Sequence, residues 1–210
     1  MIKISDFDQS FKTKLYDGVK NIESNSTAEA VVMIKHRSGH YFVYSLAAAG
    51  IMFTLSMAYF MLSPIEYDPY TMFVTSIVLA LLVGLAFKVF PGLYRIVVPR
   101  NIREKNVEIY ARALFQKAQM YKTIDHTAFL VYYSLVEHRV VFLADYGVML
   151  NTPKEEITAI EGMLNAALDA KDPKAALLDA LAKIAPIMAK YLPITGEDIN
   201  ELPDDLDIEL

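Results

Sequence analysis

The feature that most constrains this chain is a run of 22 residues without a charge, from Tyr41 to Leu62. About 20 apolar residues cross a hydrocarbon core roughly 30 Å thick, so this run is long enough to span a membrane as a helix. A second uncharged run extends from Tyr70 to Phe87 and closes with Lys88, whose long stem can reach the interface from the helix end. The sequence therefore predicts a hairpin of two transmembrane helices at roughly residues 41–62 and 71–90.

The alternative interpretation of these runs is a pair of buried helices in a soluble core. We favour the membrane hairpin because both runs reach membrane-spanning length and lie side by side in the sequence. The short connection between them, residues 63–69, contains two prolines and two acidic residues.

Basic residues flank the hairpin, whereas the connection between its helices has none. The flanking bases are Lys35, Arg37, Arg95, Arg100, Arg103 and Lys105. Basic residues near the ends of membrane helices favour the cytoplasmic side. We therefore expect a multi-pass protein of the cell (inner) membrane with both termini in the cytoplasm. Tyr41, Lys88 and Arg95 are the expected anchors at the membrane interface.

Charge and cysteine content exclude several classes of function. The net charge is −5, but the last fifteen residues carry seven acids and no base, which leaves the rest of the chain close to neutral. Without a dense basic stripe there is no electrostatic footprint for nucleic acid, and we expect no such partner. The chain has no cysteine, so disulfides, thiolate metal sites and cysteine nucleophiles are excluded.

The segments outside the hairpin predict a small α/β domain. Two polar residues, Ser5 and Asp8, have the spacing of a helix cap, and apolar residues at helical spacing follow them as far as Ile22. A further helix is expected to return from the hairpin, and two more should close the chain. The expected strands are residues 30–34, 128–136 and 140–144, the expected return helix is residues 102–120, and the last helices open at Thr152-Pro153 and Asp172-Pro173.

Connectivity constrains the sheet, because the first strand leads into the hairpin and the return helix leads out of it. The first two strands should then be parallel and the third antiparallel, with helices on both faces. The expected fold is α/β, a small mixed sheet flanked by helices and interrupted by a two-helix transmembrane hairpin. The expected divisions are residues 1–40 and 95–194 for the discontinuous domain, 41–93 for the hairpin and 195–210 for an acidic tail without predicted structure.

Several short segments, taken in order and spacing, resemble the TPM domain, in particular its membrane-inserted branch of small bacterial proteins. The segments are Ser26-Thr27-Ala28-Glu29, Val97-Val98-Pro99-Arg100, Ala111 with Phe115, Val131-Tyr132-Tyr133-Ser134-Leu135, Leu143-Ala144-Asp145-Tyr146-Gly147-Val148 and Asn200-Glu201-Leu202-Pro203-Asp204. One departure is Thr127-Ala128, where that family usually has glycine.

This resemblance implies a small sheet flanked by helix pairs. Members of the family are associated with photosystem repair, weak acid phosphatase activity and bound calcium, and bacterial members often neighbour LemA-family membrane proteins. The match carries over one residue, Asp145, which would be a calcium ligand if that ion binds.

Three residues are the candidates for ligand binding: Asp145 and Gly147 after the third strand, and Glu29 before the first. Open α/β sheets often bind ligands at the ends of strands, but we favour the alternative interpretation of Asp145 as a turn residue that bonds the backbone near Gly147. The serines lack a G-x-S-x-G elbow and there is no phosphate-binding loop, so we expect no catalytic residue.

Three classes of function remain, and a transporter ranks last because the two apolar runs contain no ion pair and no broken-helix pattern. The other two are open. The first, which we favour, is an interaction module anchored in the bilayer that serves other membrane proteins, LemA-family proteins among them, in assembly or quality control. The second is a metal-dependent, calcium-associated hydrolase resembling a phosphatase.

Overall fold

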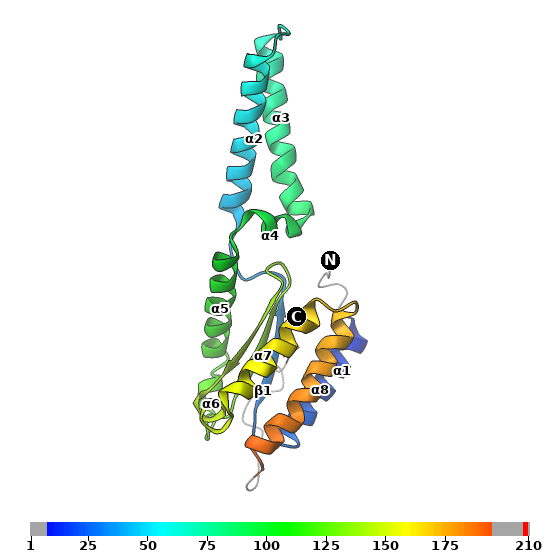
Figure 1. Ribbon diagram of the computed structural model, residues 1–210, viewed down its shortest axis with the longest axis vertical. Helices are drawn as coiled ribbons and strands as arrows, with labels where there is room; N and C mark the ends of the chain where they lie inside the picture. Colours follow the sequence, from blue (N-terminus) through cyan, green and yellow to red (C-terminus); the bar gives the residue numbers. More distant parts are fainter. Residues whose placement is uncertain (1–7, 195–207, 210) are drawn as a thin grey trace. The chain divides into compact units, whose positions relative to one another are not determined.

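The computed structural model describes residues 8–194 and 208–209, which form two compact units. One unit comprises the described residues up to Ser38 and from Glu104 onward, and the other comprises Gly39–Arg103. The first unit is a mixed α/β domain, and a hairpin of two long apolar helices interrupts it between its first strand and the following helix (Figure 1). The expected fold class is confirmed.

The sheet contains β1 (Ala30–Lys35), β2 (Phe129–Ser134), β3 (Arg139–Ala144) and β4 (Ile208–Glu209), in the order β3-β2-β1-β4. β1 and β2 pair in parallel, with Ala30 opposite Phe129, and β3 pairs antiparallel with β2. Both strand directions agree with those that the position of the hairpin predicts. Five of the six residues of β1 and all six of β2 are buried, which explains why these strands are apolar on both faces.

A short fourth strand departs from the sequence prediction, which assigned no structure to the acidic tail. Ile208 and Glu209 pair in parallel with Val32 and Met33 of β1. The edge of a strand presents unpaired N–H and C=O groups, and these can be satisfied by an extended segment of almost any composition. Net charge is therefore a poor predictor of structure at this position.

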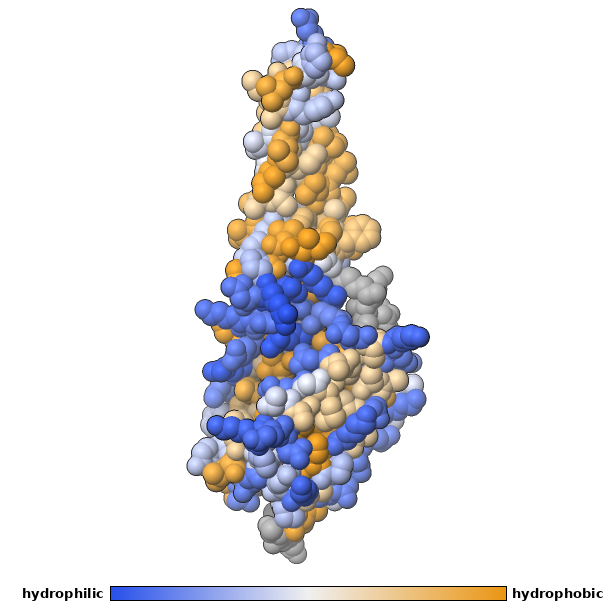
Figure 2. All heavy atoms as spheres, in the orientation of Figure 1, coloured by the Kyte–Doolittle hydropathy of each residue, from blue (hydrophilic) through white to orange (hydrophobic). Residues whose placement is uncertain are grey.

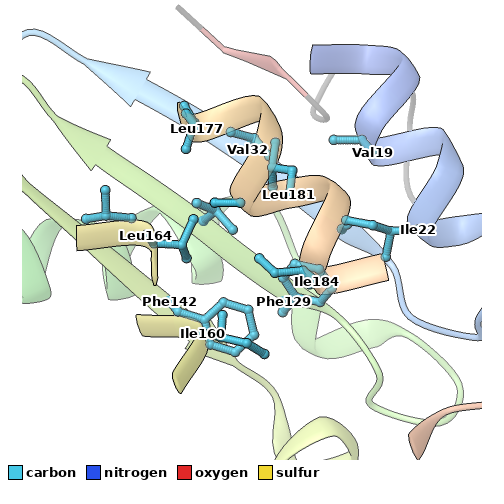
Figure 3. Close-up of a cluster of buried hydrophobic side chains, with 14 of the residues drawn as sticks. Val19, Ile22, Val32, Phe129, Phe142, Ile160, Leu164, Leu177, Leu181 and Ile184 are labelled. Carbon is cyan, nitrogen blue, oxygen red and sulfur yellow. The ribbon is translucent and has the colours of Figure 1, made fainter. Parts of the chain in front are cut away.

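Three helices cover one face of the sheet: α1 (Gln9–Glu23), α7 (Lys154–Leu168) and α8 (Pro173–Tyr191). Their apolar side chains pack against those of β1, β2 and β3, as Figure 3 shows. The labelled members of this core are Val19, Ile22, Val32, Phe129, Phe142, Ile160, Leu164, Leu177, Leu181 and Ile184. The alternation of the strands supplies every second residue to this face.

The opposite face is covered by α5 (Arg100–Lys117) (Figure 1). Val107, Ala111 and Leu114 are buried with Val31 and Met33, the alternate residues of β1. The helix ends three residues before the predicted position, because Gln119 adopts a left-handed conformation and begins the 3-10 turn η3 (Met120–Lys122).

Helix caps account for two further differences from the sequence. Asp8 caps α1, and its side chain accepts a hydrogen bond from the Phe11 amide, while the predicted cap Ser5 lies outside the described residues. Thr152 was predicted to cap α7, and this is wrong. It instead follows α6 (Tyr146–Asn151), a helix that the sequence analysis missed, and its hydroxyl is buried with no hydrogen-bond partner among the described residues.

The second unit is built on α2 (Phe42–Leu62) and α3 (Pro69–Val89), followed by the 3-10 turn η2 (Pro91–Leu93) and the short helix α4 (Tyr94–Val97). The start of α3 precedes the predicted residue 71 because Asp68 caps it and Pro69 occupies its first turn. By length and composition, α2 and α3 are both able to cross a membrane.

Candidate functional site

Asp145 follows β3 and caps α6. One of its carboxylate oxygens, Oδ1, accepts a hydrogen bond from the Tyr146 amide at 2.8 Å, and the other, Oδ2, lies 3.1 Å from Nδ1 of His126. Both oxygens are thus engaged within the domain. This is the structural role that the sequence analysis weighed against ligand binding.

Gly147 is required by a close approach of two backbone segments. Its amide donates to the carbonyl of His126 at 2.9 Å, and a Cβ atom at this position would lie 2.2 Å from the carbonyl oxygen of Asp125. Any side chain at position 147 would therefore displace the 125–126 loop. His126 has a φ of 54°, so the loop itself turns through the left-handed region to reach the glycine.

Glu29 lies at the same end of the sheet as Asp145. The Phe129 amide donates to the Glu29 carbonyl, and the Asp145 amide donates to the Ala128 carbonyl. These bonds place the start of β1, the start of β2 and the end of β3 side by side. β2 separates the two acidic residues, and neighbouring strands are about 4.8 Å apart. The structure thus brings all three candidate residues to one end of the sheet.

The residues at this end of the sheet do not fit a calcium ion. Calcium takes six to eight oxygen ligands, typically from several carboxylates. Among the described residues there is no group of three or more side chains of the kind that holds a metal, and both oxygens of Asp145 already have partners. This end of the sheet also holds the amino ends of the parallel strands β1 and β2, whereas open sheets favour ligands at the carboxyl ends of their strands.

A buried polar cluster that the sequence analysis missed lies at the carboxyl ends of β1 and β2. Glu137 is only 3% exposed and accepts a hydrogen bond from the Ser38 amide at 2.9 Å and another, at 2.5 Å, from the Ser134 hydroxyl. The Ser38 hydroxyl lies 2.8 Å from both the Ser134 hydroxyl and the Tyr132 phenol. We call these four residues the Glu137 cluster.

The electrostatics of the Glu137 cluster favour a neutral phenol. Burial raises the pKa of Tyr132 well above its ordinary value, the hydrogen bonds with Ser38 and Ser134 lower it by less, and the charge of Glu137 raises it further. Part of the signal for this cluster was present in the sequence, since Ser38 follows the first strand of a predicted parallel pair and Ser134 lies in the second. The cluster ties the segment that leads from β1 toward the hairpin to the β2–β3 turn.

An exposed apolar stripe lies beside Asp145. Tyr146, Met149 and Leu150 project from one side of α6, at spacings of three and four residues, and all are exposed. Ile124, which precedes the loop packed on Gly147, is also exposed. The domain therefore exposes apolar side chains at the end of the sheet that carries the predicted site residues.

The hairpin buries few residues, most of them serines, and exposes most of its large apolar side chains. The residues that α2 and α3 bury are three serines and Phe87, whereas leucine, isoleucine and phenylalanine side chains are exposed along both helices (Figure 2). Each serine hydroxyl donates to a carbonyl of its own helix: Ser45 to Phe42, Ser56 to Phe53 and Ser76 to Met72. This arrangement is the reverse of a helix pair stabilised in water.

The predicted membrane anchors occupy one end of the hairpin unit. Tyr41 is buried against Tyr94, with ring centroids 5.6 Å apart, and Arg95 follows Tyr94 in α4. Lys88 is exposed in the last turn of α3. Tyr41 is thus a packing residue of this unit, while Lys88 and Arg95 supply charge at its surface.

The chain matches no family model and no curated protein in sequence. In structure it is similar to the BA42 protein from the psychrophilic bacterium Bizionia argentinensis, solved by NMR, with a TM-score of 0.60 and 16% sequence identity. The match covers 100% of each chain. At this identity the likeness concerns the fold alone.

Proposed function

We propose that this protein is a membrane-inserted relative of the TPM domain, anchored by α2 and α3, that serves as an interaction module for other membrane proteins. The observation that carries this proposal is that α2 and α3 bury serines and expose large apolar side chains. The two helices expose 17 large apolar side chains. Exposing them to water is unfavourable by about 25 cal/mol per Å², whereas a bilayer accepts them. Helix pairs in lipid pack through small residues such as the three buried serines.

The orientation in this proposal rests on charge. Within the hairpin unit the acids Glu66 and Asp68 lie in the connection, and all its lysines and arginines lie in the last turn of α3 or after it. The positive-inside rule then keeps both ends of the hairpin, and the α/β domain with them, in the cytoplasm.

Insertion and orientation can be tested with single cysteines, because the native chain has none. Glu66→Cys places a thiol in the connection, and Asn25→Cys places one on the exposed surface of the domain. In spheroplasts, an impermeant maleimide should label only Glu66→Cys, and Asn25→Cys should react only after the membrane is opened. Reversed labelling would refute the orientation. No labelling of either thiol in intact spheroplasts, or equal labelling of both, together with extraction of the protein at alkaline pH, would refute insertion.

The interaction role is supported by the exposed stripe Tyr146, Met149 and Leu150 with Ile124. Contiguous apolar side chains on a domain surface often mark a binding site for another protein. Anchoring to a bilayer raises the effective concentration of such a surface toward other membrane proteins without any new contact. By resemblance, LemA-family proteins are candidate partners. The engaged carboxylate of Asp145 and the poor fit to calcium rank the hydrolase alternative lower.

A photo-crosslinker can locate this interaction. Placed at Leu150 in native membranes, it should give one dominant product with a membrane protein, and the same group at Lys171, an exposed polar position, should not. Products of equal yield at both positions would show that the apolar stripe is not the contact.

A further inference from the structure

The segment that leaves α3 forms a structured elbow, which we define as residues 90–98. It contains η2 and α4, and several of its backbone amides donate hydrogen bonds to carbonyls within the segment or at the end of α3. The Leu93 amide donates to the Phe90 carbonyl at 3.0 Å, and the Val98 amide donates to the Tyr94 carbonyl at 2.9 Å.

A buried aromatic cluster fixes the elbow to the hairpin. Tyr94 packs between Tyr41, at 5.6 Å, and Phe87, at 5.1 Å between ring centroids, and all three rings are buried. These residues come from the start of α2, the end of α3 and α4. Because α4 is held by two helices, the residues that flank Tyr94 have a defined position at the open end of the hairpin.

The outer side of the elbow combines exposed apolar residues with basic ones. Ile96, in α4, is 81% exposed and Phe90, the C-cap of α3, is 63% exposed, although both are large apolar side chains. Arg95 adjoins Ile96, and Lys88 lies two residues before Phe90. Apolar and basic side chains together are typical of segments that lie in the headgroup region of a membrane.

All lysines and arginines of the hairpin unit gather around this elbow. They are Lys88, Arg95, Arg100 and Arg103, whereas both acids of the unit lie at its closed end. Arg103 also donates from Nε to the Val98 carbonyl at 3.2 Å, which adds a side-chain contact to the end of the elbow. The positive-inside rule explains which way such a hairpin inserts, but it requires no structured elbow and no exposed Ile96.

We infer that the elbow is a binding surface for anionic phospholipid headgroups, with Lys88, Arg95 and Arg100 contacting the phosphates and Phe90 and Ile96 inserting beside them. This inference rests on the proposed insertion of the hairpin. Each basic residue at a membrane surface favours anionic lipid by roughly fivefold. Arginine adds bidentate geometry toward phosphate oxygens.

The test uses the full-length protein and a single indole, since the chain has no tryptophan. Ile96→Trp reports from the elbow, and Leu55→Trp reports from the exposed side of α2. Each is placed in vesicles of phosphatidylcholine with a minority of phosphatidylglycerol, and one of the two lipids is brominated in turn to quench fluorescence. The indole at position 96 should be quenched by brominated phosphatidylglycerol more strongly than the share of that lipid in the vesicles predicts. The indole at position 55 should be quenched by each lipid in proportion to its share.

Removing charge at the elbow should remove the preference. In the Ile96→Trp background, Arg95→Gln with Arg100→Gln should lower the preference for phosphatidylglycerol by at least about fivefold. The matched control, Lys14→Gln with Lys171→Gln, removes the same charge from exposed positions of the domain and should leave it unchanged.

Each outcome is decisive. Equal quenching by both lipids at position 96, with clear quenching at position 55, would overturn lipid recognition and leave insertion intact. A loss of preference in the control pair would also overturn it, because net charge would then be the cause. Absence of quenching at both positions would refute the membrane insertion on which the inference rests.

Discussion

At the scale of the residue, Asp145 combines two roles that a sequence pattern does not separate. Its carboxylate accepts from the Tyr146 amide and pairs with His126, and the same residue was the candidate calcium ligand that the resemblance to the TPM domain implied. The geometry favours the structural role, because a carboxylate that caps a helix and contacts a neighbouring imidazole is already satisfied.

Substitutions of Asp145 distinguish these roles. Asp145→Ala should lower the free energy of unfolding by about 1 kcal/mol, because the cap of α6 is lost, whereas Asp145→Asn should retain most of the stability, since asparagine caps equally well. Thermal unfolding in detergent measures both. Equal stability of the alanine variant and the native protein would argue that the residue is kept for a ligand.

Tyr132 gives a prediction in pH. Burial is the largest cause of its raised pKa, so the folded protein keeps the phenol neutral at a pH where the unfolded chain, with an ordinary pKa of about 10, ionises. The contribution to stability is fully present below pH 10 and is lost as pH rises above it, by up to about 1.4 kcal/mol per pH unit. Tyr132→Phe should therefore flatten the decline in unfolding free energy above pH 10.

The matched control for this experiment is Tyr121→Phe, at a tyrosine that is 39% exposed. Its pH profile should follow that of the native protein. Parallel profiles for all three proteins would contradict the assigned role of Tyr132 burial.

At the scale of the element, the hairpin depends on small residues at the contact between α2 and α3. Ser56 is buried in that contact, whereas Gly50, on the same helix, is exposed, and a Cβ there would meet no atom within 4 Å. Ser56→Leu should destabilise the hairpin by roughly 1–3 kcal/mol, because added volume at a packed site forces the helices apart. Gly50→Leu should be tolerated.

Loss of helicity on titration with a denaturing detergent measures this effect in mixed micelles. The transition of Ser56→Leu should come at a lower detergent fraction than that of Gly50→Leu. The reverse order would mean that the lipid-facing side of α2 has been assigned to the wrong residues.

At the scale of the whole molecule, the α/β domain should fold without the hairpin that interrupts it. The core on both faces of the sheet is made of residues outside 39–103, and the cost of closing a loop rises slowly with its length. Replacing residues 40–98 by a flexible linker of about ten residues should give a soluble protein with one cooperative melting transition. The cut removes Tyr94 together with Tyr41 and Phe87, so no partner of that aromatic cluster is left exposed.

Circular dichroism and size-exclusion chromatography measure the outcome. Retention of Ser38 preserves the hydrogen bond to Glu137. A second variant that also carries Glu137→Ala should have a free energy of unfolding lower by roughly 2–3 kcal/mol, because buried donors lose their acceptor. Aggregation with every linker length tried would show that the domain requires the hairpin.

The sequence by itself determined the elements whose signal is local. The length of the uncharged run marked α2, the run of strand formers marked β1, and Asp172-Pro173 marked the start of α8. The parallel pairing of β1 with β2 also followed, because the hairpin between them fixes the direction in which the chain must leave and return.

Only the tertiary structure decided the features that depend on segments far apart in the chain. Ser38 and Glu137 are 99 residues apart, and their contact depends on the register of β1 against β2. The need for glycine at position 147 depends on the 125–126 loop, and the short strand at Ile208 depends on the edge of β1. Local patterns report propensity and amphipathicity, but a contact across the sheet is set by pairing register and packing, which no single segment encodes.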